Sequence, residues 1–401
     1  MSFLDRRTSS PYPLPPGERV SGSVHALLTA AAVRERAHDM LDLALDGKVE
    51  GWRVDLDRLA DAADLTAAVT RENYPDLIIP FHARARHFVA GPPKLPEADP
   101  ATRARASFDL IILSVLLDAG TGPVWRYVDP VTGGTFARSE GLAVASQRMF
   151  EAGELDDLSG LETETLARGF QVTADNPLAG LEGRAALIRR LGDQIAARPD
   201  LFGGRPGGLF DILAREGCLP APSILELLLE ALGPIWADRL TINGVPMGDC
   251  WAHSALRRDD DPLSAIVPLH KLSQWLSYSL IEPLQEAGIE VADIDGLTGL
   301  AEYRNGGLFV DTGVLVLTDP QDATRAHQVS DPLIVAWRAM TVALLDRMAP
   351  LVRERLGVTQ AAFPLARMLE GGSWAAGRRI AAELRPGGGP PFTIISDGTV
   401  F

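Results

Sequence analysis

Apolar residues recur at helical spacing along most of this 401-residue chain. In a helix that packs one face against a core, apolar side chains return every three or four residues. The pattern covers residues 24–46, 56–72, 101–118, 139–152, 183–197, 223–232, 268–287, 332–356 and 360–370. These segments leave little chain for an extended sheet, so we predict a mainly α fold, a compact multi-helix body.

Two short stretches of β-forming residues interrupt the helical pattern. Residues 308–317 have two apolar arms around Gly313 and follow the turn-forming sequence Asn305-Gly306-Gly307, which predicts a small β-hairpin. Residues 392–395 read Phe-Thr-Ile-Ile and predict a short C-terminal strand.

Chain length and turn-forming stretches bear on the domain organisation. Protein domains commonly contain roughly 150 residues, so a chain of this length suggests two to three domains. Residues 1–22 are rich in proline, and residues 200–208 are rich in glycine but too short to form a free linker. We expect an extended N-terminal segment over residues 1–22. Residues 23–401 then form a single compact helical enzyme domain, or two intimate halves that meet near residues 200–210.

Charge and composition exclude several classes of protein. The net charge of −15 disfavours nucleic acid as a partner, because proteins that follow phosphates depend on dense Lys and Arg. The apolar run 110–117 is much shorter than the ~20 residues that cross a bilayer, so we expect no membrane partner. Two cysteines in such a chain fit a reducing compartment, and the charged, proline-rich start does not resemble a signal peptide. We expect a cytoplasmic protein.

Polar and aromatic residues are densest between residues 243 and 311. Small turn-forming residues precede Asp249, and Trp251 and His253 follow it. A loop of this kind can present Asp249 to a ligand, but Asp249 can also cap a helix that begins at Cys250. Cys250 and His253 lack a second tight pair with zinc spacing, so we expect neither a metal nor a cofactor.

Residues 269–280 separate into two stripes on a helical wheel. Four leucines form one stripe, and His270, Gln274 and Tyr278 belong to the other. A solvated face would normally carry Glu, Arg and Lys. The second stripe therefore either faces a ligand or forms a buried hydrogen-bond network.

A glycine-rich stretch brings further charged residues to this region. Glu302 and Arg304 either form a salt bridge with each other or bind a substrate, with Arg304 on an anionic group and Glu302 on a hydroxyl or a water. Upstream, Arg84, Arg86 and Arg138 supply the local positive charge that a small phosphate-bearing substrate would require. Each of these basic clusters taken alone is typical of a solvated face.

Several common catalytic motifs are absent from the sequence. It has no Gly-x-Ser-x-Gly elbow, no P-loop lysine pattern and no Gly-x-Gly-x-x-Gly after a strand. Serine hydrolase, NTPase and Rossmann oxidoreductase functions therefore lose support.

Six motifs together indicate a family. They are GDCW at 248–251, HKLSQWL at 270–276, LTGLAEYRNGG at 297–307, SDGTVF at 396–401, RSEGLAVAS at 138–146 and NPLAGLEGR at 176–184. With them the chain resembles, over nearly its whole length, the uracil-catabolism family of the URC pathway, long described only as a domain of unknown function. Its helical layout is more distantly similar to that of queuosine salvage nucleosidases.

This resemblance implies a place in a route that opens the uracil ring and eventually releases urea. A fitting step is hydrolysis of the N-glycosidic bond of ribosylurea or its 5′-phosphate, so the expected partner is a small ribosyl or ribosyl-phosphate substrate. A rival hypothesis is a noncatalytic helical partner protein, and association with other uracil-catabolism enzymes fits both. A phosphoribosyltransferase is less favoured, because no paired-acid phosphoribosyl loop follows a strand.

The chemistry of that hydrolysis suggests roles for the candidate residues. Breaking the bond builds positive charge on the sugar, which Asp249 or Glu302 can stabilise while orienting a water. His270 is the candidate general acid for the urea leaving group. The expected substrate-binding residues are Asp311 for a ribose hydroxyl, Lys271, Arg304, Arg84 and Arg86 for a phosphate, Trp251 or Tyr278 beside the ureido group, and Gln274 and Arg138.

Overall fold

The computed structural model describes residues 23–215, 217–236 and 239–395, which form two compact units. Unit 1 contains the described residues of 1–82, 239–274 and 293–395, and unit 2 contains those of 83–238 and 275–292. The expected N-terminal segment 1–22 and the terminal motif 396–401 lie outside the described residues. That residues 23–401 act as one domain stays a prediction, and the glycine-rich residues 200–208 lie inside unit 2.

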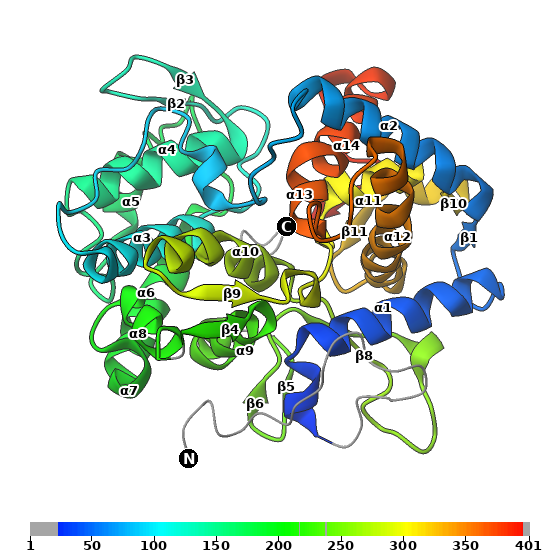
Figure 1. The fold of residues 1–401 in the computed structure, drawn as a ribbon, viewed down its shortest axis with the longest axis horizontal. Helices are drawn as coiled ribbons and strands as arrows, with labels where there is room; N and C mark the ends of the chain where they lie inside the picture. The colour runs from blue at the N-terminus through cyan, green and yellow to red at the C-terminus, as the bar shows by residue number, and fades with distance from the viewer. Residues whose placement is uncertain (1–22, 216, 237–238, 396–401) are drawn as a thin grey trace. The chain divides into compact units, whose positions relative to one another are not determined.

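Unit 1 is built mainly from helices that pack around α12. Figure 1 shows α1, in blue, beside α12, in orange. The helices of this unit are α1 (Ala30–Leu45), α2 (Leu59–Asn73), α11 (Tyr303–Asp311), α12 (Pro332–Leu356), α13 (Leu365–Met368) and α14 (Trp374–Leu384). Both α1 and α2 pack on α12, whose residues from Leu333 to Leu345 are all buried. This burial explains why α12 carries an almost continuous apolar sequence instead of a narrow stripe.

Small strand pairs join distant segments of unit 1. Strand β1 (Trp52–Val54) pairs with β10 (Leu315–Leu317), and β7 (Cys250–Ala252) pairs with β8 (Ile266–Pro268), both antiparallel. Strands β5 (Thr241–Ile242) and β6 (Val245–Pro246) form a short hairpin. Strand β11 (Ala326–Gln328) pairs in parallel with β12 (Thr393–Ile395), which confirms the predicted C-terminal strand.

Unit 2 is also mainly helical. Its helices are α3 (Pro100–Leu116), α4 (Arg138–Glu151), α5 (Thr163–Gly169), α6 (Leu181–Ala197), α7 (Pro199–Phe202), α8 (Leu209–Leu213) and α9 (Ala221–Leu232). A 3₁₀ turn, η4 (Arg84–His87), packs on α3 and α4. The strand pairs are β2 (Tyr127–Val128) with β3 (Thr135–Phe136), and β4 (Cys218–Pro220) with β9 (Glu290–Ala292). Helix α10 (Lys271–Glu286) has its first four residues in unit 1 and the rest in unit 2.

The mainly α fold with small hairpins is confirmed, but the hairpin predicted at residues 308–317 is wrong. Residues 303–311 form helix α11, and only Leu315–Leu317 is a strand, whose partner β1 comes from far away in the chain. Helix α11 begins because Glu302 caps it, and its two glycines do not make a turn. The hairpins lie instead at β2–β3 and β5–β6.

The predicted helices agree closely with those observed in both units. The segment 24–46 contains α1, and Gly47, with φ +70°, follows its end as a helix-stop glycine should. The prediction for 332–356 coincides with α12. The segment 360–370 is helical only from Leu365, and it continues through a π-helical turn at Leu369–Ser373 into α14. None of the helices in the described ranges combines the length and apolar character that crossing a bilayer requires.

Candidate functional site

The strand pair β7–β8 positions Asp249. Cys250 pairs with Pro268, so the residue before β7 lies beside the residues that follow β8. The carbonyl oxygen of Asp249 accepts hydrogen bonds from the backbone N–H of Leu269 (2.9 Å) and of His270 (3.3 Å). The Asp249 carboxylate is thereby held at the start of α10.

Four donors occupy the two oxygens of the Asp249 carboxylate. Arg338 of α12 donates through both terminal nitrogens, at 2.8 Å to Oδ1 and 2.7 Å to Oδ2. The indole of Trp251 donates to Oδ1 (2.7 Å), and the backbone N–H of Lys271 donates to Oδ2 (3.0 Å). The Arg338 charge and these hydrogen bonds outweigh the burial that opposes them, so the pKa of Asp249 is lowered. Asp249 is therefore an ionised carboxylate that is fixed in place.

Asp249 does cap a helix, although not the one considered from sequence. Residues 250–252 form strand β7, so a helix beginning at Cys250 is wrong. Lys271 is the first residue of α10, and its N–H is the group that Asp249 accepts. A negative charge at a helix N-terminus is favoured by the helix dipole, and here the charge comes from a segment 22 residues upstream.

Glu302 caps a second helix. Its two carboxylate oxygens accept hydrogen bonds from the backbone N–H groups of Arg304 and Asn305, each at 2.6 Å. The residue is only 7% exposed. Burial raises the pKa of Glu302, while the charges of Lys271 and Arg304 and the two backbone hydrogen bonds work against this increase. Glu302 is thus the carboxyl of this region that holds a proton to higher pH.

Arg338 connects the two acids. Besides gripping Asp249, its Nε donates to the carbonyl of Ala301, the residue before Glu302 (3.2 Å). Arg338 is 1% exposed, so its charge is compensated inside the unit. Lys271, whose N–H binds Asp249, lies close enough to lower the pKa of Glu302. Asp249, Lys271, Glu302 and Arg338 therefore form one polar cluster in unit 1, which we call the two-acid cluster.

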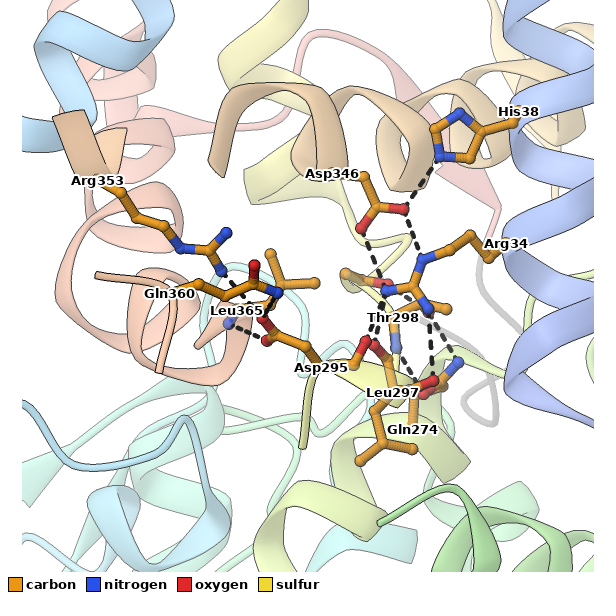
Figure 2. A network of polar contacts seen from close by, with 12 residues as sticks. Arg34, His38, Gln274, Asp295, Leu297, Thr298, Asp346, Arg353, Gln360 and Leu365 are labelled. Carbon is orange, nitrogen blue, oxygen red and sulfur yellow. Dashed lines mark hydrogen bonds and ion pairs between the residues drawn. The ribbon is translucent and has the colours of Figure 1, made fainter. Parts of the chain in front are cut away.

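The segment that leads into Glu302 is held by Gln274 and Arg34 (Figure 2). Gln274 donates to Thr298 Oγ1 (2.7 Å) and accepts from the Thr298 N–H (3.3 Å). Arg34 of α1 donates to the carbonyl of Leu297 (2.9 Å) and forms an ion pair with Asp346 of α12 (2.7 Å). Gln274, expected to bind substrate, has its amide committed to this support.

Arg304 and Asp311 are engaged with other parts of unit 1. Glu302 accepts a hydrogen bond from the backbone N–H of Arg304 and not from its guanidinium. The Arg304 guanidinium instead donates to the Gly388 carbonyl (2.8 Å) and lies over the Tyr303 ring. Asp311, expected to hold a ribose hydroxyl, pairs with Arg385 through both oxygens (2.7 and 2.5 Å). Substrate binding by Arg304 and Asp311 stays a prediction.

Four further candidate residues belong to unit 2, whereas the two-acid cluster belongs to unit 1. Arg84 pairs with Asp118 (2.6 Å) and Arg86 with Glu282, so neither cation is without a carboxylate. Tyr278 is buried in α10, and Arg138, with φ +54°, begins α4. Their contribution to substrate binding also stays a prediction.

A match to a family model covers residues 26–401, and the family is described as a protein of unknown function, DUF1688. The chain belongs to the DUF1688 family. It is 40% identical over 407 residues to Protein urg3 of Schizosaccharomyces pombe, covering 94% of this chain and 99% of that protein. It is 35% identical over 440 residues to Uracil catabolism protein 4 of Lachancea kluyveri, covering 95% and 100%. The family indicated by the sequence motifs is thus confirmed.

Sequence reasoning missed Arg338, the residue that joins the two acids of this DUF1688 chain. A signal was present, because Arg338 is the one charged residue within the apolar stretch 332–345. A lone Arg on a buried helix needs an acidic partner, and Asp249 was already singled out. Ser373, in the π-helical turn, was also missed; it donates to the Asn305 side chain (2.8 Å) and so supports the first turn of α11.

A metal site requires several His, Cys, Asp or Glu side chains that converge on one point. Over residues 23–215, 217–236 and 239–395, no three His, Cys, Asp or Glu side chains come together in an arrangement that could hold a metal ion. Cys250 lies 3.7 Å from the His270 ring, which is a pair and not a ligand set.

Proposed function

We propose that this DUF1688 protein acts in uracil catabolism as an N-glycosidic bond hydrolase that releases urea from ribosylurea or its 5′-phosphate. Support for the pathway comes from a relative of nearly equal length that is named Uracil catabolism protein 4. Support for the reaction comes from the opposite pKa shifts of Asp249 and Glu302 within the two-acid cluster. In glycoside-cleaving sites, the carboxyl with the raised pKa acts as the acid, and the carboxyl that stays ionised stabilises positive charge.

In the proposed reaction, water replaces the ureido group at the anomeric carbon of ribose. As the C1′–N bond breaks, its electrons move to the ureido nitrogen and Glu302 donates a proton there, so that neutral urea leaves. The positive charge that develops on the sugar is stabilised by the ionised Asp249. Water forms the new C1′–O bond and returns a proton to Glu302, giving ribose or ribose 5-phosphate.

Asp249 suits an electrostatic role better than that of a proton acceptor. Arg338, Trp251 and the Lys271 N–H occupy both of its oxygens and hold them in one orientation. Fixed charge that need not reorganise during the reaction is the form of electrostatic stabilisation that lowers barriers most. Glu302 accepts hydrogen bonds from two backbone N–H groups, and burial raises its pKa against the charges of Lys271 and Arg304.

The test is to incubate the purified protein with ribosylurea and with its 5′-phosphate and to assay free urea. We expect urea from at least one of the two substrates. Glu302→Gln should lower turnover by about 10²–10⁴-fold, the usual contribution of a positioned acid. Glu354→Gln, an exposed position on α12, is the matched control and should leave turnover unchanged. No urea from either substrate, with the protein co-purifying with another pathway enzyme, would instead favour a noncatalytic partner.

A further inference from the structure

His270 has one ring nitrogen whose role is fixed by its partner. The residue lies between β8 and α10, is 1% exposed and has an unusual positive φ of 46°. Its Nε2 is 3.0 Å from the carbonyl oxygen of Leu27. A carbonyl oxygen only accepts hydrogen bonds, so Nε2 carries the hydrogen and donates it.

The other ring nitrogen is left as an acceptor. Burial lowers the pKa of His270, which favours the neutral ring. In a neutral imidazole that is protonated on Nε2, Nδ1 presents a lone pair. Nδ1 is buried and has no hydrogen-bond partner among the residues that the structure describes. An acceptor of this kind is rare, because buried polar atoms are nearly always paired by protein, water or ligand.

The acceptor lies beside the two-acid cluster. A Cβ atom added to Gly248 would be 3.9 Å from Nδ1, so the nitrogen faces a backbone position without a side chain. Gly248 has φ +60° and directly precedes Asp249. The charges of Asp249 and Arg338 both act on the His270 ring, and Cys250 is the remaining titratable neighbour. His270 Nδ1 therefore lies beside Gly248, the residue that precedes the aspartate that we propose stabilises the sugar cation.

We propose that His270 Nδ1 accepts a hydrogen bond from an N–H group of the substrate and thereby selects ribosides whose leaving group is a ureido group. This inference rests on the proposed function and assigns His270 to substrate recognition instead of acid catalysis. Ureido groups carry N–H donors next to the bond that breaks, whereas O-glycosides have none there. A site with a buried acceptor rejects a ligand that lacks the matching donor, because the acceptor is then left unpaired.

Two substitutions separate the two ring nitrogens. His270→Gln can place an amide N–H where Nε2 was, which keeps the bond to Leu27 and removes the acceptor. His270→Asn can place an amide oxygen where Nδ1 was, and Asn tolerates positive φ. We expect His270→Gln to keep its melting temperature and to lose about tenfold or more in affinity for ribosylurea. His270→Asn should keep that affinity and melt at a lower temperature.

Binding is measured by calorimetry with ribosylurea, each substitution being made together with Glu302→Gln so that the ligand is not consumed. As a second measurement, ¹⁵N NMR of histidine-labelled protein should report an unprotonated Nδ1 whose signal shifts when urea is added. The inference would be overturned if His270→Gln bound ribosylurea with unchanged affinity, or if Nδ1 were protonated. It would also be overturned if urea left the Nδ1 signal unchanged, which is the result expected when a bound water is the partner of Nδ1.

The same experiments separate this inference from the proposed function. A protein that releases no urea, but whose Nδ1 signal responds to urea, would refute the hydrolase and retain the acceptor. A protein that releases urea, but whose His270→Gln variant binds ribosylurea normally, would refute the acceptor and retain the hydrolase.

Discussion

Asp249 and Glu302 are both acids at the first turn of a helix, yet their surroundings shift their pKa values in opposite directions. Asp249 receives a full positive charge from Arg338 as well as hydrogen bonds. Burial raises the pKa of Glu302, and neither the nearby charges of Lys271 and Arg304 nor its two backbone N–H hydrogen bonds offset that increase. The direct ion pair that Arg338 forms with Asp249 is therefore what divides their proposed roles.

The raised pKa of Glu302 predicts a pH dependence of activity and of stability. If Glu302 is the acid, turnover falls as pH rises through its folded-state pKa, and Glu302→Gln removes that alkaline limb. The folded state binds this proton more tightly than the unfolded state. The free energy of unfolding therefore falls as pH rises from the unfolded pKa through the folded one. Rate profiles and denaturant unfolding at several pH values check both; an unchanged alkaline limb in Glu302→Gln would contradict the assignment.

The lowered pKa of Asp249 predicts the opposite dependence. Its stabilising effect is present above its unfolded pKa and is lost as pH falls through the lower folded one. Asp249→Asn also removes the carboxylate charge that faces the buried Arg338, which should cost about 3–5 kcal/mol of unfolding free energy. Denaturant unfolding measures this loss. The double substitution Asp249→Asn with Arg338→Met should cost less than the sum of the two single changes, and simple additivity would show that the pair is not coupled.

At the scale of elements, α11 shows how glycines can support a helix instead of breaking it. A Cβ atom at Gly306 would lie 2.7 Å from the Trp337 ring of α12. Trp337 also donates its indole N–H to the Gly306 carbonyl (3.1 Å). A Cβ at Gly377 of α14 would lie 2.1 Å from the Arg304 carbonyl. The glycines thus let α12 and α14 pack directly on the backbone of α11.

Two adjacent alanine substitutions test this packing. Gly306→Ala should lower the free energy of unfolding by about 1–3 kcal/mol or more, because the new methyl group meets the Trp337 ring. Gly307→Ala is the matched control, since the nearest atom to its Cβ is 3.4 Å away. It should be neutral or stabilising by up to about 1 kcal/mol, the gain in helix propensity. Chemical denaturation of both variants measures the difference; equal effects would show that close packing is not why Gly306 is there.

The hairpin predicted at residues 308–317 is wrong because packing between elements decides the structure of this short apolar segment. The β-forming residues Leu308, Phe309 and Val310 pack well in either a strand or a buried helix. The cap by the adjacent Glu302 and the packing of α12 against Gly306 both favour the helix, and the second of these depends on a distant segment. The structure of a short apolar run is decided by tertiary packing, whereas the length of the 25-residue α12 already favours a helix over a strand.

At the scale of the molecule, unit 1 is assembled from three separate parts of the sequence. Its central helix α12 packs on α1 and α2, which precede unit 2 in the chain. Strand β10 likewise finds its partner β1 in the first part. The two-acid cluster comes entirely from residues 239–395, but the helices that bury α12 come from residues 23–82.

This arrangement predicts that the chain cannot fold correctly from its second half alone. Residues 239–401 expressed without the first part should be largely unfolded or aggregated, because the apolar faces of α12 that α1 and α2 cover would be exposed. Co-expression with residues 1–238 should restore solubility and the helical circular dichroism signal. A soluble, cooperatively folded 239–401 fragment would contradict this.

The sequence alone determined the mainly α class, the position of most long helices, the C-terminal strand and the family, since these depend on local periodicity and short motifs. It also pointed to Asp249, Glu302 and His270. Tertiary structure alone decided the surroundings of these residues: the ion pair with Arg338 helps lower the pKa of Asp249, burial raises the pKa of Glu302, and the Leu27 carbonyl oxygen accepts from His270 Nε2. A side chain's proton depends on the charges and solvent within a few ångströms of it, and those neighbours come from segments far away in the chain.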